Sequence, residues 1–137
     1  MHTNSSRGTF EDLFPLLPVP IAHIAYHLRG LIGDIYSNTT EIPKPKENHA
    51  DYAVGSGKRN EIFGYICPME KYVRLGFYYG GALPDPAGLM VGEGKVGNSV
   101  SALRHVKIYS LAEAERPEIC ALIQAAVQER KSALGVK

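Results

Sequence analysis

The sequence predicts an α+β domain in which an N-terminal helix and a C-terminal helix pack on one face of an antiparallel sheet of four to five strands. Two observations carry this prediction. Apolar residues recur at helical spacing near both ends of the chain, and between them they alternate with polar residues at strand spacing. Because the strands are grouped and the helices flank them, both helices are expected on the same face, which leaves the other face open.

Length and charge limit the organisation and the partners. A chain of 137 residues has the size of one domain, so residues 1–137 are expected to form a single unit, with 1–8 as a disordered tail. The 15 Lys and Arg nearly balance the 14 Asp and Glu, and this balance disfavours nucleic acid as a partner because little counterion release would drive binding. The sequence has no apolar run long enough to span a membrane, so a membrane partner is not expected. We expect a cytoplasmic protein by default.

Both helices have clear boundary signals. Thr9 and Asp12 have capping-box spacing and predict a short helical turn. The first long helix is expected from about Pro20 to Ile35. Its buried face should consist of Ile21, Ile24, Ala25, Leu28, Leu31, Ile32 and Ile35. The last helix is expected to follow a second capping box, Ser110 with Glu113, and to end at Gly135.

The strands are predicted from alternation. Pro43 and Pro45 indicate that Tyr36 to Asn48 is a connecting loop. Strands are expected at 52–54, 62–67, 71–79 and 104–109, with a further brief strand at 89–91. The clearest pattern lies in 71–79, where Val73, Leu75 and Phe77 alternate with polar residues.

The polar positions of these strands suggest a ligand site on the open face. Tyr72, Arg74 and Tyr78 should point away from the helices, and His105 and Lys107 should do the same. Aromatic rings, cations and imidazoles at such positions suit a small anionic ligand. The same composition also suits a homodimer contact, and this alternative stays open.

The other motifs do not indicate catalysis. Gly92, Gly94 and Gly97 match the dinucleotide-binding fingerprint in letters, but they lie between expected antiparallel strands instead of opening a helix in a parallel unit, so a turn is expected there. Cys67 and Cys120 lie in no recognisable nucleophile motif. We therefore expect a protein that is not an enzyme.

A metal site is conceivable on the first helix. His23 and His27 are four residues apart and can present both imidazoles to one divalent ion, with Asp34 about two turns further along. The alternative is a solvated helical face.

The stretch from Tyr72 to Lys95 carries Val73-Arg74-Leu75-Gly76-Phe77-Tyr78, Gly81-Ala82-Leu83-Pro84-Asp85-Pro86 and Gly92-Glu93-Gly94-Lys95. Together with Arg104-His105-Val106-Lys107-Ile108, it resembles the YdhG-like domain family. The resemblance implies a fold similar in outline to frataxin. Because some members of the family are described as intracellular iron chaperones, it also implies a role in holding Fe(II). Residues 97–102 are an addition to the family pattern, and the first helix carries no dense row of acidic residues.

Overall fold

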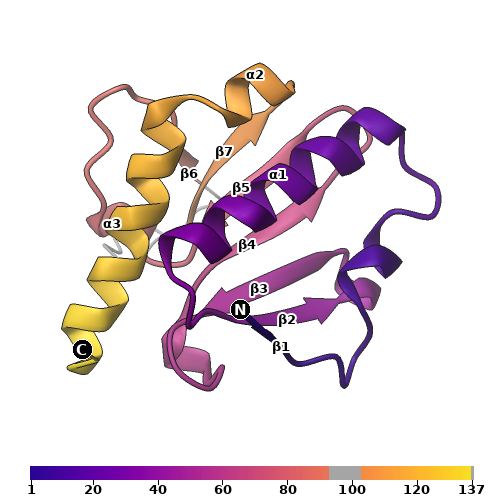
Figure 1. The fold of residues 1–137 in the computed structure, drawn as a ribbon. Helices are drawn as coiled ribbons and strands as arrows, with labels where there is room; N and C mark the ends of the chain where they lie inside the picture. Colours follow the sequence, from indigo (N-terminus) through magenta and orange to yellow (C-terminus); the bar gives the residue numbers. More distant parts are fainter. Residues whose placement is uncertain (93–102, 137) are drawn as a thin grey trace.

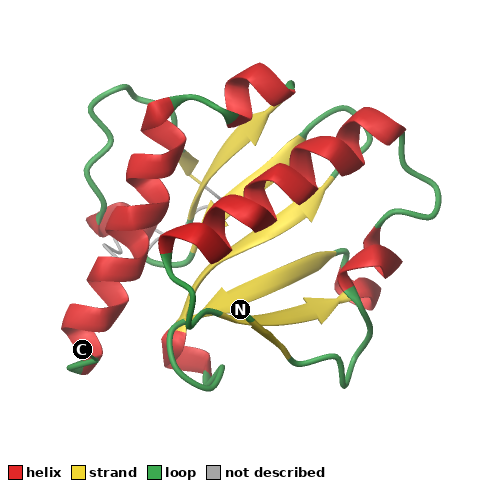
Figure 2. Ribbon diagram, viewed as in Figure 1, coloured by secondary structure: helices red, strands yellow, loops and turns green. Residues whose placement is uncertain are grey.

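The protein is built on one seven-stranded sheet with helices on one face (Figures 1 and 2). A computed structural model describes residues 1–92 and 103–136. The sheet order is β1-β2-β3-β4-β5-β7-β6, and all neighbours pair antiparallel except β1 and β2, which are parallel. The strands are β1 (His2–Thr3), β2 (Thr40–Lys44), β3 (His49–Ala53), β4 (Ile62–Pro68), β5 (Val73–Phe77), β6 (Val91–Gly92) and β7 (Arg104–Ile108).

The long helices α1 (Val19–Ile35) and α3 (Pro117–Leu134) lie on the same side of this sheet, as predicted (Figure 1). The short helix α2 (Leu111–Ala114) connects β7 to α3. Four 3₁₀ turns complete the described elements: η1 (Phe10–Leu13), η2 (Pro45–Glu47), η3 (Arg59–Glu61) and η4 (Gly80–Ala82). None of the described helices is apolar over enough residues to span a bilayer.

The hydrophobic core fills the space between the helices and one face of the sheet. The apolar stripe predicted for α1 is buried at Ile21, Ile24, Ala25, Leu28 and Ile32. The sheet contributes alternate residues, among them Ile66, Val73, Leu75, Phe77, Val106 and Ile108. Alternation in β5 and β7 therefore confirms that one face packs against helices, and it places Arg74 and Lys107 on the opposite face.

The predicted loop at Tyr36 to Asn48 is wrong, because it contains β2 and η2. The loop was predicted because Pro43 has no backbone N–H and cannot donate a hydrogen bond to a neighbouring strand. In the structure Pro43 is opposite Ala50 of β3, while β1 reaches only Thr40 and Glu41 on the other side of β2. Pro43 thus lies where β2 is a sheet edge, which is the position that tolerates proline in a strand.

The N-terminal segment also departs from the prediction. His2 and Thr3 pair with Thr40 and Glu41, and the Met1 amino group donates a hydrogen bond to the Ser37 carbonyl oxygen (2.7 Å). Residues 1–4 are therefore held against the sheet, where a loose tail was expected over 1–8. With β1, β2 and β6 included, the sheet has seven strands and is mixed, where four to five antiparallel strands were expected.

A buried polar cluster attaches α1 to the N-terminal edge of the sheet. Glu41 is fully buried and accepts two hydrogen bonds from Arg29 of α1, Nε to Oε2 at 2.6 Å and Nη2 to Oε1 at 2.8 Å. Tyr52 Oη donates to Oε2 at 2.8 Å, and Thr3 Oγ1 donates to Oε1 at 3.0 Å. One carboxylate thus links α1, β1, β2 and β3.

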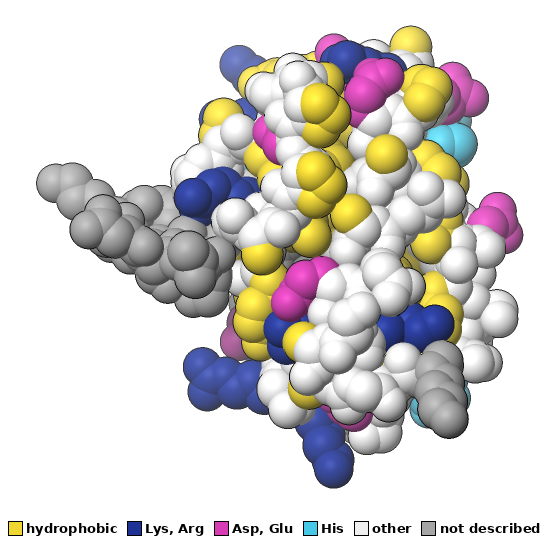
Figure 3. Space-filling model, turned by 90° about the vertical axis from the view of Figure 1, so that its left-hand side faces the viewer, with side chains coloured by type: hydrophobic (Ala, Val, Ile, Leu, Met, Phe, Trp, Pro, Cys, Tyr) yellow, Lys and Arg dark blue, Asp and Glu magenta, His cyan; other side chains and the backbone are white. Residues whose placement is uncertain are grey.

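On the side of the molecule that carries α3, charges of both signs are interspersed with hydrophobic atoms (Figure 3). This distribution agrees with the near-neutral charge of the sequence. The glycine motif beyond Gly92 and the predicted addition at 97–102 lie outside the described residues.

Candidate functional site

The open face, defined here as the sheet face opposite α1 and α3, carries alternate residues of β2, β3, β4, β5 and β7. Strand register places Arg74 opposite Lys107 and Gly76 opposite His105. The ring of Tyr65 lies over Gly76, so a Cβ at this glycine would overlap the ring. Glycine at position 76 therefore lets an aromatic ring lie flat on the middle of the open face.

The five predicted ligand-binding residues divide into two groups. Tyr72, Arg74 and Lys107 lie together at one end of the face. The Lys107 Nζ is 5.4 Å from the centre of the Tyr72 ring, and the centres of the Tyr72 and Tyr109 rings are 5.3 Å apart. Tyr78 lies elsewhere, where it contacts β3, and His105 is a buried residue of β7. The structure therefore does not gather the predicted set into one site.

The strongest polar cluster on the open face surrounds Asp51 of β3. This carboxylate is only 2 % exposed. Tyr78 Oη donates to Oδ1 at 2.6 Å, and Lys44 Nζ lies 2.8 Å from Oδ2. Burial alone would disfavour the charged carboxylate, but the contacts with His49, Lys44 and Tyr78 outweigh it and lower the pKa of Asp51.

His49 is the second basic side chain at this carboxylate. Its Nε2 lies 3.2 Å from Asp51 Oδ1, and its Nδ1 lies 3.2 Å from the Glu47 carbonyl oxygen. A protonated imidazole can donate at both nitrogens, whereas a neutral one can donate at only one. The contact with Asp51 accordingly raises the pKa of His49 above 6.5, although its partial burial and Lys44 act in the opposite direction.

This arrangement predicts pH-dependent stability. Because the folded pKa of His49 is raised, its contribution is complete below about 6.5 and is lost as the pH rises through the folded value. In urea titrations from about pH 5 to 9, the free energy of unfolding lost on His49→Gln should therefore shrink as the pH rises. His23→Gln, which removes an exposed imidazole from α1, is the control for loss of a histidine. A loss that stays constant over this range would contradict the ionised contact.

Asp51 forms part of the wall of a pocket of about 470 Å³, here called the Asp51 pocket. It is lined by Lys44, Asp51, Arg59, Ile62, Tyr78, Tyr79 and Leu103. These residues come from β2, β3, η3, the start of β4, and the segments that follow β5 and precede β7. The pocket combines two cationic side chains, one buried carboxylate, aromatic rings and aliphatic walls, a composition typical of small-molecule sites.

Arg130 of α3 holds two walls of this pocket in place. Its guanidinium carbon lies 3.4 Å from the centre of the Tyr79 ring, and its Nη1 donates to the Asn60 carbonyl oxygen at 2.9 Å. Glu129 accepts two further hydrogen bonds from the same guanidinium, at 2.6 and 2.7 Å. One almost buried side chain thus fixes both Tyr79 and the turn that presents Arg59.

Sequence reasoning missed three principal residues of the pocket. Lys44 was assigned to a loop, Asp51 fell just before the expected strand, and Arg59 was assigned to a turn. The signal that could have found Asp51 is the alternation of His49 and Asp51 with Ala50 and Tyr52 in β3. Lys44 has no such signal of its own, because it joins this face only through the pairing of β2 with β3. Only pairing of distant strands brings Tyr78 and Arg59 to them.

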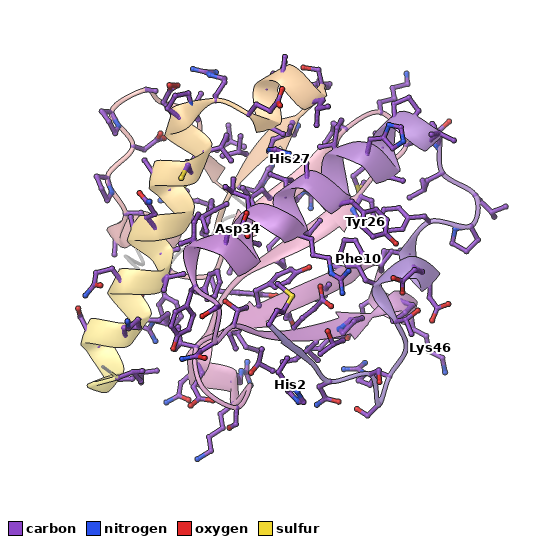
Figure 4. All side chains as sticks on the ribbon, viewed as in Figure 1. His2, Phe10, Tyr26, His27, Asp34 and Lys46 are labelled. Atoms are coloured by element: carbon purple, nitrogen blue, oxygen red, sulfur yellow. The ribbon has the colours of Figure 1, made fainter. Side chains whose placement is uncertain are left out.

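The predicted metal residues do not form a centre. His23 and Asp34 are exposed, His27 is half-buried, and Figure 4 shows His27 and Asp34 on separate turns of α1. Within residues 1–92 and 103–136, no group of three or more His, Cys, Asp or Glu side chains is placed to hold a metal ion. None of the family models, curated proteins or solved structures compared with this chain matches it.

Proposed function

We propose that the protein is a small-molecule-binding domain that holds an anionic ligand in the Asp51 pocket. The observation that carries this proposal is the presence of Lys44 and Arg59 on the walls of one 470 Å³ pocket, where Asp51 is the one carboxylate among the described lining residues and already contacts Lys44 and His49. An anion that enters this pocket meets positive charge that the described carboxylates do not neutralise. The pocket is partly shielded from water, and charge-assisted hydrogen bonds are strong in such surroundings.

The donors support this assignment. An ammonium group has three donors, and Lys44 directs one of them to Asp51, which leaves two for a ligand. Arg59 is exposed, and among the described residues no carboxylate forms an ion pair with it. Its planar guanidinium suits two-point binding of a phosphate or carboxylate group. Tyr78 and Asp51 add polar atoms that can orient the rest of the ligand.

Calorimetric titration with inorganic phosphate tests the proposal. Saturable binding is expected, and Arg59→Ala should weaken it about tenfold, equivalent to about 1.4 kcal/mol. Arg59 is the appropriate residue to remove because its side chain is exposed. The Asp51 contacts with Lys44, His49 and Tyr78 should survive the change.

Arg116→Ala is the matched control, since it removes the same exposed side chain at the start of α3, outside the pocket. Its phosphate affinity should equal that of the wild type. Absence of saturable binding, or equal weakening in both variants, would contradict the proposal.

The other expectations stay predictions. Membership of the YdhG-like family, Fe(II) handling and self-association through the open face each need their own test. The Asp51 pocket favours an anion over Fe(II), because a hard cation needs several oxygen ligands and the described residues of its lining supply one carboxylate, Asp51.

A further inference from the structure

We infer that the ligand carries two anionic groups, and that the second is held in a cleft lined by Ser6, Arg7, Lys44 and Lys46, here called the Lys46 cleft. The inference rests on the proposed function, because it extends the Asp51 pocket. Its first support is that Lys44 lines both cavities, whose volumes are about 470 and 350 Å³. The two cavities therefore share the Lys44 side chain as a wall.

The Lys46 cleft is shaped by packed backbone. Pairing of β1 with β2 brings residues 4–8 next to η2, and Asn4 N donates to the Glu41 carbonyl oxygen at 2.8 Å. Gly8 has a φ of +138°, and a Cβ there would come within 2.6 Å of Pro45 Cγ. Because Gly8 lies directly against η2, the chain carries Ser6 and Arg7 to the side of Lys44 and Lys46.

Charge favours an anion in this cleft. Of the described residues that line it, Arg7, Lys44 and Lys46 are cationic, and Figure 4 shows Lys46 projecting from the η2 region. The neighbouring carboxylates include Asp51, which is buried against Lys44 and His49, and Glu47, which lies 3.5 Å from Arg7. Asp12 also lies beside Gly8, where a Cβ would come within 3.3 Å of its Oδ2. The Arg7–Glu47 pair is half-exposed on both sides, so little free energy opposes a turn of Arg7 toward a ligand.

Two donors on Lys44 can serve two different groups of one ligand. One group would contact Lys44 and Arg59 in the Asp51 pocket, and the other would contact Lys44, Arg7 and Lys46 in the cleft. A diphosphate, or another small molecule with two phosphate-type groups, has the chemistry that this arrangement recognises. Linking the groups makes the second contact intramolecular, which strengthens binding beyond that of either group alone.

Titration of the full chain with inorganic phosphate and with pyrophosphate tests this inference. Pyrophosphate should bind at least about tenfold more tightly than phosphate in the wild type. The greater charge of pyrophosphate also strengthens its binding. The decisive quantity is therefore the ratio of pyrophosphate affinity to phosphate affinity, compared between the wild type and the variants. In Lys46→Ala this ratio should fall at least about fivefold, while phosphate affinity stays within about twofold of wild type.

Lys71→Ala is the matched control, because it removes an exposed lysine from the turn between β4 and β5, outside both cavities. It should keep the wild-type ratio, and Arg7→Ala should lower it as Lys46→Ala does. If pyrophosphate and phosphate bind equally, or if Lys46→Ala and Lys71→Ala change the ratio equally, the two-group ligand is refuted while the Asp51 pocket stands. Failure of phosphate itself to bind refutes the proposed function.

Discussion

Arg29→Ala should lower the free energy of unfolding by about 3–5 kcal/mol, the typical cost of leaving a buried charge without its partner. Glu41 is fully buried, and it would lose two hydrogen bonds of 2.6 and 2.8 Å and keep those from Tyr52 and Thr3. Arg29 also lies over the Phe10 ring, with its guanidinium carbon 4.8 Å from the ring centre, so packing of η1 is lost as well. Urea denaturation followed by circular dichroism measures the change.

Arg116→Ala serves as control, because it makes the same change at the Arg116–Glu118 ion pair, where both side chains are more than a third exposed. An exposed pair contributes about 0–1 kcal/mol, so this variant should unfold almost as the wild type does. Equal losses in the two variants would show that the Glu41 cluster does not attach α1 to the sheet as described.

Gly64→Ala should be the second most damaging change, with a loss near the upper end of about 1–3 kcal/mol. Gly64 lies in β4 opposite Phe77, and a Cβ there would lie 2.6 Å from the Gly76 carbonyl oxygen. The clash is with the backbone of the neighbouring strand, which cannot rotate away as a flexible side chain would. The change should therefore displace β5 and lower the midpoint of thermal unfolding.

The same substitution at Gly30 is the control. Gly30 is an exposed residue within α1, and a Cβ there meets nothing within 4 Å. Alanine should stabilise this position by about 0.5–1 kcal/mol because glycine disfavours a helix interior. The two variants thus move stability in opposite directions, and a Gly64→Ala protein as stable as Gly30→Ala would contradict the close packing of β4 on β5.

Local patterns sufficed for most elements of the fold. The stripe around Leu28 and the alternation around Leu75 encode burial directly, so the helices and the central strands were predicted near their observed positions. Strand β2 could not be found in this way, because Pro43 is acceptable only where β1 has ended, and β1 consists of two residues. Such short pairing depends on tertiary contacts that leave no periodicity in the sequence.

The site was predictable only in outline. Alternation correctly placed Arg74 and Lys107 on the face opposite the helices. It could not show that Tyr78 contacts Asp51, since the two are 27 residues apart and their meeting depends on the β3–β4–β5 pairing. Alternation also could not indicate Arg59. The position of Arg59 depends on Arg130 of α3, which donates a hydrogen bond to the carbonyl oxygen of the neighbouring Asn60.

Backbone amide NMR spectra recorded during a phosphate titration test most directly whether an anion occupies the Asp51 pocket. Saturating shifts should concentrate at Lys44, Asp51, Arg59 and Tyr79, while amides of the exposed α1 face around His23 stay unchanged. Shifts that never saturate, or that gather instead around Tyr72 and Lys107, would contradict the assignment.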